Sequence, residues 1–153
     1  SGVAFLSIQP RVQVQGSDGI AVELGTGSIL HEYKYITTDS GSVNKWSVFN
    51  SPTGFYYFDL LNRTWNKFSG NSITNLGDTF GMHAFFQNNT NYTDLVIDNP
   101  LKKTGITGVF DQINNMAMLT VLQNGNSYTL SFNEKSNLFT SFWGNGSNQL
   151  SQC

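Results

Sequence analysis

Paired carboxylates that could act as an acid and a base are the first catalytic arrangement to look for in this chain. Asp94 and Asp98 flank the apolar run 95–97, and Glu32 stands close to aromatic residues in the sequence. Glycoside hydrolysis requires two carboxyl groups roughly 5 to 10 Å apart. Because ten acidic residues always supply some pair of this kind, a glycan-degrading enzyme is retained only as the second alternative function.

The two histidines, His31 and His83, do not form a metal-ligand pattern. Neither is followed by a second histidine at the spacing of a His-x-x-x-His motif. His31 lies in an alternating run, which favours a solvent-facing strand position, and His83 lies in a short apolar segment, which favours a hydrogen-bonded packing role. The run 25–27 lacks the third glycine and the lysine of a phosphate-binding loop. We therefore predict no metal site, no cofactor and no catalytic residues.

Aromatic side chains on a polar strand surface are the remaining arrangement with a chemical use, since a ring face stacks on the C–H groups of a sugar. The candidates share a setting rich in Asn, Ser, Thr and Gly, and are Trp46, Tyr56, Tyr57, Trp65 and Trp143. Alternation along strands places about half of such residues in the core. Trp65 and Trp143 are kept as candidate sugar-stacking residues. A carbohydrate-binding β-domain that recognises host-surface glycans is the first alternative function.

The composition is that of a weakly acidic chain with many aromatic and few charged residues. Aromatics make up 14% and charged residues 12% of 153 residues, and the formal net charge is −2. This balance disfavours a protein that binds nucleic acid by neutralising phosphates. A low share of charge also indicates a surface that is partly covered by neighbouring subunits, which predicts an oligomer.

The sequence contains no run with the length of a membrane span and does not open on the pattern of a signal peptide. The only cysteine is Cys153, so an internal disulfide is excluded. The chain begins with Ser1 instead of methionine, which indicates a processed product, a tag remnant or an excerpt of a longer protein.

Short alternating runs that end in Asn, Gly, Asp or Ser predict an all-β fold with little helix. We divide the chain into an N-terminal β segment or connector (1–29), a first four-stranded meander (30–70), a connection with a short helix and an Asn-rich stretch (71–104), and a second four-stranded meander with a C-terminal tail (105–153). The strands expected in the first meander are 30–36, 45–50, 55–58 and 64–68. The short helix is expected over 78–86 with Asp78 as its N-cap. The pair Asn124-Gly125 predicts a hairpin turn in the second meander, because both residues tolerate positive φ.

An aromatic strand-turn-strand unit recurs in the two meanders. Matching residues are 74 positions apart without a gap, and are Phe58, Asp59, Trp65, Phe68 and Gly70 in the first copy and Phe132, Asn133, Phe139, Phe142 and Gly144 in the second. The Asp or Asn holds a tight turn by binding its own downstream backbone. The aromatic residue six positions later lies on the returning strand, and the one three further on is expected on the opposite face. Either a duplicated meander or two unrelated aromatic hairpins produces this pattern.

Two four-stranded antiparallel meanders can be arranged in two ways. They have the length of β-propeller blades, although a closed propeller typically needs four to eight of them. Alternatively, the two sheets pack face to face as a β-sandwich. We predict propeller-blade-like meanders, with the two-sheet β-sandwich as the alternative.

Three stretches of the sequence resemble tail structural proteins of short-tailed, crAss-like bacteriophages. They are 44–48 (NKWSV), 51–59 (SPTGFYYFD) and 128–142 (YTLSFNEKSNLFTSF), and the resemblance covers about 30–144. The family members concerned are large tail-hub, muzzle or nozzle subunits with propeller-type β-modules. The resemblance therefore implies a β-module of a large virion protein.

The same resemblance implies a structural function in the virion tail, in the tail-end assembly through which DNA exits or which faces the host. It implies a homo-oligomer in contact with other tail subunits. It brings no cofactor, no enzymatic activity and no catalytic residue to this chain. Specific nucleic-acid binding and a membrane span are not expected.

Overall fold

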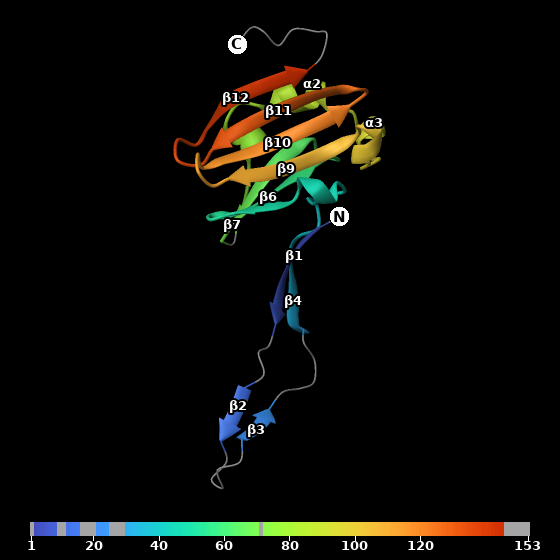
Figure 1. The fold of residues 1–153 in the computed structure, drawn as a ribbon. Helices are drawn as coiled ribbons and strands as arrows, with labels where there is room; N and C mark the ends of the chain where they lie inside the picture. Colours follow the sequence, from blue (N-terminus) through green and yellow to red (C-terminus); the bar gives the residue numbers. More distant parts are fainter. Residues whose placement is uncertain (1, 9–11, 16–20, 25–29, 71, 146–153) are drawn as a thin grey trace. The chain divides into compact units, whose positions relative to one another are not determined.

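The computed structural model describes residues 2–8, 12–15, 21–24, 30–70 and 72–145. The chain forms two compact units, one of residues 2–39 and one from Ser40 onward. The described strands of both units pair in antiparallel fashion (Figure 1). The all-β fold class predicted from the sequence, with four-stranded antiparallel sheets, is confirmed.

The unit 2–39 consists of two hairpin pairings. β1 (Val3–Ile8) pairs with β4 (Leu30–Thr37), and β2 (Val12–Gln15) pairs with β3 (Ala21–Leu24). This pairing corrects the expectation that 30–36 is the first strand of a meander over 30–70.

Local hydrogen bonds explain why the segment after β4 does not continue as a strand. Thr37 Oγ1 accepts from the backbone N–H of Asp39, and Ser42 Oγ donates to the backbone oxygen of Asn44. That same oxygen accepts from the backbone N–H of Ser47, which closes the 3₁₀ helix η1 (Lys45–Ser47). Side chains of this kind offer the backbone an alternative to a strand ladder. Of the strand expected over 45–50, only residues 49 and 50 therefore lie in a strand.

The first sheet contains β5 (Phe49–Ser51), β6 (Gly54–Asp59), β7 (Thr64–Ser69) and β8 (Ser72–Asn75), in that order. Its fourth strand therefore comes from 72–75, beyond the boundary that the sequence suggested at residue 70. The sheet begins at Phe49 and not at residue 30.

The second sheet contains β9 (Gly105–Asp111), β10 (Met116–Gln123), β11 (Asn126–Asn133) and β12 (Leu138–Asn145). Its strands follow one another as a meander, in the order β12-β11-β10-β9. Asn124 and Gly125 connect β10 to β11 with φ values of 51° and 76°. The hairpin turn predicted at this pair is confirmed.

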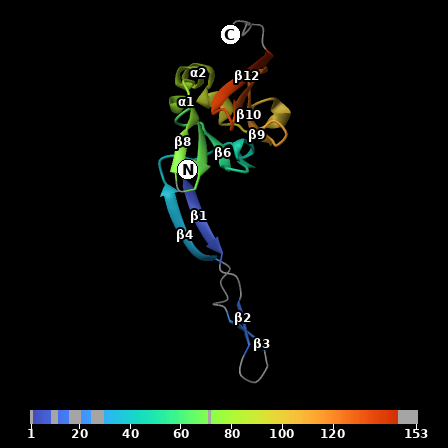
Figure 2. The same ribbon diagram turned by 90° about the vertical axis from the view of Figure 1, so that its left-hand side faces the viewer.

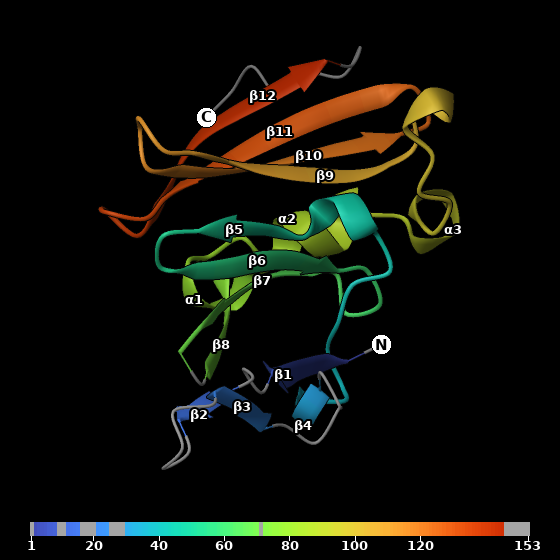
Figure 3. The same cartoon turned by 60° about the horizontal axis from the view of Figure 1, so that its bottom comes forward.

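The two sheets lie in separate layers and share one core (Figure 3). Tyr56, Phe58 and Trp65 enter the core from the first sheet, and Leu119 and Phe132 enter it from the second. The ring centroids of Trp65 and Phe139, one from each sheet, are 6.0 Å apart. This packing is the face-to-face arrangement that the sequence analysis kept as its alternative.

Three short helices complete the core beside the sheets. They are α1 (Leu76–Thr79), α2 (His83–Asn89) and α3 (Tyr92–Leu95), and α1 lies next to α2 (Figure 2). A 3₁₀ turn, η2 (Pro100–Lys102), follows them. Phe86 and Leu95 are fully buried, so the connection between the sheets is part of the core.

The helix expected over 78–86 is divided into two by Gly81, which has a φ of 80°. The expectation that Asp78 caps it is wrong. The N-cap of α1 is Asn75, whose side-chain oxygen accepts from the backbone N–H of Asp78 at 3.1 Å. Both residue types cap helices well, so sequence alone did not distinguish the two positions.

Candidate functional site

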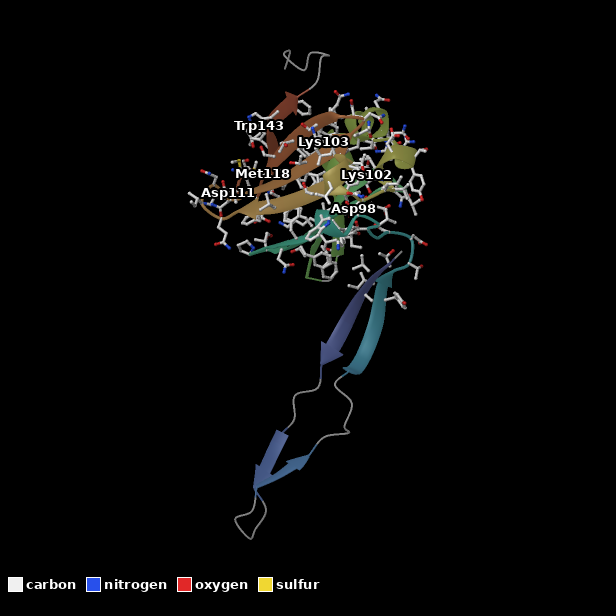
Figure 4. All side chains as sticks on the ribbon, turned by 45° about the vertical axis from the view of Figure 1, so that its right-hand side comes forward. Asp98, Lys102, Lys103, Asp111, Met118 and Trp143 are labelled. Carbon is white, nitrogen blue, oxygen red and sulfur yellow. The ribbon has the colours of Figure 1, made fainter. Side chains whose placement is uncertain are left out.

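The side of the second sheet that points away from the core is the candidate functional surface. Along β10, Ala117, Leu119 and Val121 are fully buried, so the residues between them point to the opposite side. We call this surface the outer face. It contains side chains of all four strands, namely Thr107, Val109, Met116, Met118, Thr120, Thr129, Ser131, Thr140, Ser141 and Trp143, of which Ser131 is fully covered by its neighbours. Figure 4 labels Met118 on β10 and Trp143 on β12.

Cross-strand neighbours on the outer face form two rows. One row is Val109, Met118, Ser131 and Ser141, and the other is Thr107, Thr120, Thr129 and Trp143.

Hydroxyl groups on the outer face bind each other across the strands. The Oγ1 atoms of Thr120 and Thr129 are 2.8 Å apart, and Ser131 Oγ lies 2.9 Å from Thr140 Oγ1. These contacts hold the four side chains in place, since each of these four hydroxyls has a partner within the sheet. Val109 and Trp143 are the exposed large apolar side chains of this face.

Charge is confined to the margin of the second sheet. Among the residues of β9–β12 only Asp111 is charged, and it ends β9. Asp111 Oδ2 accepts from Asn114 Nδ2 at 2.7 Å, and Oδ1 accepts from the backbone N–H of Ile113 at 2.9 Å. Hydrogen bonds from Asn114 lower the pKa of Asp111. The Asp111 carboxylate therefore stabilises the turn between β9 and β10.

A second carboxylate, Glu134, connects the two sheets. Glu134 lies just after β11, and its Oε1 accepts from the hydroxyls of Ser51, Thr53 and Tyr56 at 2.7, 2.7 and 2.6 Å. Lys67 Nζ is 3.1 Å from the same oxygen. Burial by itself would raise the pKa of Glu134, but the bonds from Ser51, Tyr56, Thr53 and Lys67 outweigh burial and lower the pKa to about 2. Sequence reasoning missed this residue, because its partners lie far away in the chain.

The aromatic residues of the recurring unit occupy matching positions in two hairpins. Phe58 lies opposite Trp65 across β6 and β7, and Phe132 lies opposite Phe139 across β11 and β12. Phe58, Trp65 and Phe132 are buried, and Phe139 packs against the same core.

The turn residues of the unit also have matching geometry. Asp59, Asp111 and Asn133 each accept, through Oδ1, a hydrogen bond from the backbone N–H three positions later, at 3.1, 3.3 and 3.1 Å. The residue four positions later has a positive φ in all three turns, namely Arg63 (53°), Asn115 (55°) and Asn137 (54°). A short side chain that binds the backbone explains why Asp or Asn stands first in each turn.

The last part of the unit differs between the two hairpins. In β7 the ladder is regular, so Phe68 points to the face opposite Trp65. In β12 a β-bulge adds one residue after Phe139, and Phe142 therefore packs against the core on the same side. The expectation of opposite faces is wrong for β12. Gly70 follows β7 with a φ of 63°, whereas Gly144 lies within β12.

The sequence matches one known protein family over nearly its whole length. The model of the crassvirus muzzle protein family matches residues 1–148. The chain belongs to this family. It is also 28% identical over 141 residues to the muzzle protein of Bacteroides phage crAss001, a match that covers 92% of this chain. The chain spans about one tenth of the length of that relative. The resemblance to crAss-like phage proteins of the muzzle type, predicted from three sequence stretches, is confirmed.

The two tryptophans considered for sugar stacking have very different environments. Trp65 is fully buried between the sheets, so the prediction that its ring stacks on a sugar is wrong. Trp143 is 50% exposed and lies beside Thr129 on the outer face. Trp46 is equally exposed, but it lies in η1, where the ammonium group of Lys45 is 4.6 Å from the ring centroid.

The carboxylates considered for acid–base catalysis have different environments, and Asp98 Oδ1 is buried without a hydrogen-bond partner among the described residues. Asp94 Oδ2 accepts from Asn124 Nδ2 at 2.7 Å. Asp98 lies against Gly105, where an added Cβ would be 2.5 Å from Asp98 Oδ1. Glu32 belongs to β4 in the unit 2–39. Within the described ranges, no group of three or more His, Cys, Asp or Glu side chains is placed to hold a metal ion.

The side chain of His83 is 55% exposed and lies beside an aspartate. His83 Nδ1 lies 2.5 Å from Asp78 Oδ1 at the start of α2, and His31 lies in β4. In the part of the chain that the structure describes, no helix is long and apolar enough to cross a membrane.

Proposed function

We propose that this chain is a structural component of a crAss-like phage virion. We place it in the tail-end assembly through which DNA exits or which faces the host. The observation that carries the proposal is the match of the crassvirus muzzle protein family over residues 1–148. The name of the crAss001 relative supports the same role for this chain.

The architecture of the described unit suits a structural component. Two sheets share one aromatic core, and Glu134 binds hydroxyls of the first sheet from the end of β11. The outer face carries no charged side chain except Asp111 at its margin, and hydroxyls on it bind each other, as expected for a surface that packs against other tail subunits. We infer that the chain is a non-enzymatic member of a homo-oligomer, and that the matching hairpins derive from a duplicated strand-turn-strand unit.

Immuno-electron microscopy of purified virions tests the location. Antibodies raised against the chain are expected to label the tail end of each particle, and antibodies against a capsid protein serve as the control. Labelling of the capsid alone would contradict the tail assignment. Labelling that disappears when virions are washed at high salt would contradict a structural role.

The weakly acidic charge predicts that the chain does not hold DNA tightly. With a formal net charge of −2, phosphate neutralisation cannot supply much affinity. Titration of duplex DNA at low salt is expected to give no saturable binding. Tight, salt-sensitive binding would contradict the view that the chain lines a DNA path without binding DNA.

A carbohydrate-binding role is the second candidate, and it depends on Trp143. The half-exposed ring beside Thr129 has the form of a sugar platform, with a hydroxyl next to an aromatic face. A glycan array with the wild-type chain tests this role. Loss of a bound glycan on Trp143→Ala, with binding kept by Trp46→Ala, would support it, because the two tryptophans are equally exposed. An array without any bound glycan would contradict the carbohydrate-binding role.

A further inference from the structure

β12 is the long open edge of the two sheets in the described part of the chain. Among these residues it pairs with β11 and with no other strand. The other edges are shorter or carry a charged residue. β5 has three residues and β8 has four. β9, the opposite edge of the second sheet, ends in a charged residue, Asp111, and packs closely against the first sheet and η1, since a Cβ added to Gly108 would lie 2.2 Å from the ring of Phe49 and 3.3 Å from the backbone oxygen of Ser47.

β12 lacks two of the features that usually prevent edge strands from pairing with other chains, namely a charged residue and a proline. Natural edges carry charged residues, especially lysine, or a proline, or a bulge. β12 has eight residues, none of which is charged or proline. Its bulge lies near its beginning, between the residues opposite Ser131 and Phe132, and the ladder from Ser141 onward is regular. More than half of β12 therefore forms a regular, uncharged edge that pairs on one side only among the described strands.

We propose that β12 is a self-association site, at which the edge of one chain pairs antiparallel with β12 of a second copy. The pairing would join two four-stranded sheets into one continuous sheet with a continuous outer face. The place of this pairing in a virion rests on the proposed function. The inference adds that the partner of β12 is a second copy of this chain. The pairing itself is a property of the isolated chain.

Charge and side-chain size favour a second copy as the partner. In an antiparallel self-pair, two copies of the same strand lie side by side and run in opposite directions. Charges of one sign would therefore face each other in many registers. β12 carries no charge, so it meets no such repulsion. The regular part of β12 (141–145) pairs with itself when Trp143 lies opposite its counterpart, and the large Phe142 of each copy then lies opposite the small Gly144 of the other. Trp143, half exposed in the single chain, would then be covered.

Sedimentation velocity with three forms of the full chain tests the proposal. All carry Cys153→Ser, which removes the only thiol and hence any disulfide dimer. The parent form is expected to dimerise reversibly between about 1 and 200 µM, since a single added ladder gives modest affinity. Ser141→Lys places a charge on the open edge and is expected to weaken the dimer at least tenfold. Thr107→Lys places the same charge on the outer face of β9, far from the edge in strand order, and is expected to leave the dimer intact.

A parent chain that stays monomeric over the whole range would overturn the proposal, as would equal weakening by both lysine variants. If Ser141→Lys also lowers the thermal midpoint, loss of the dimer could result from partial unfolding of the variant. Hydrogen exchange of the parent chain then tests the β12 pairing directly. Amides of β12 should become more protected as concentration rises, while those of β9 should not change. Unchanged β12 amides would overturn the proposal.

The outcome is separable from that of the proposed function. Dimerisation through β12 together with virions that are not labelled at the tail would contradict only the location. Labelled tails together with a monomeric chain would contradict only the self-pairing. Protection of β12 in virions but not in the concentrated chain would identify a different chain as the partner and overturn a second copy.

Discussion

Replacing Glu134 by glutamine tests whether one carboxylate stabilises the junction of the two sheets. The Glu134 side chain is 7% exposed and that of Lys67 is 16% exposed. Glutamine keeps the shape but removes the charge that strengthens the bonds from three hydroxyls and faces Lys67. Lowering the pKa of Glu134 from 4.5 to about 2 corresponds to about 3 kcal/mol in favour of the charged form. Lys67 is partly exposed, so solvent screens its attraction to Glu134 and reduces this value. We therefore expect a loss of about 2 kcal/mol in the free energy of unfolding.

The dependence of this loss on pH has a definite sign. The pKa of Glu134 is lower in the folded chain than in the unfolded chain. Its contribution is therefore fully present above the unfolded value of 4.5 and is lost as the pH falls towards about 2. The difference between wild type and Glu134→Gln should be about 2 kcal/mol at neutral pH and close to zero at about pH 2.

Urea unfolding followed by tryptophan fluorescence measures this difference, because Trp65 is buried in the core between the sheets. Lys135→Gln is the matched control, since it removes an exposed charge at the neighbouring position and should change stability by less than about 0.5 kcal/mol. A Glu134→Gln chain as stable as wild type at neutral pH would refute the reasoning. So would a loss that stays the same down to pH 2.

Further substitutions test close packing and turn chemistry by the same unfolding assay. Gly108→Ala should cost about 2–3 kcal/mol, because the new Cβ would lie 2.2 Å from the Phe49 ring. Gly125→Ala should cost only about 1 kcal/mol, since its φ of 76° is unfavourable but the space beside it is open; equal costs for the two would contradict the packing argument. Asp59→Ala should cost about 2 kcal/mol, since this buried carboxylate also accepts from the backbone N–H of Gly41. Asp111→Ala in the corresponding exposed turn should cost less than Asp59→Ala, and the reverse order would contradict this view of the turns.

Local chemistry made much of the second sheet predictable. Its turn at Asn124-Gly125 follows from two residues that tolerate positive φ, and its other two turns begin with an Asp or Asn that binds its own backbone. The first sheet was less predictable, because β4 alternates like a strand of that sheet but pairs with β1. A strand pattern states that a segment is extended and does not state which strand lies beside it.

The candidate surface was only partly visible in the sequence. Trp65 and Trp143 look alike as isolated aromatics, yet one is fully buried and the other half exposed. The bulge in β12 turns Phe142 to the same side as Phe139, which simple alternation does not reveal. Glu134 carried no local signal, since the three hydroxyls that bind it are all about 80 positions away.

The sequence by itself determined the all-β class, the turn positions and the resemblance to crAss-like phage proteins. These properties depend on residues within a few positions of one another, where backbone sterics and short side-chain hydrogen bonds decide the conformation. Tertiary structure decided the face-to-face packing, the open edge of β12, the burial of Trp65 and the contacts of Glu134. Each of these depends on which distant segments meet, and that is set by the shared core, to which side chains of both sheets and of the connecting helices contribute together.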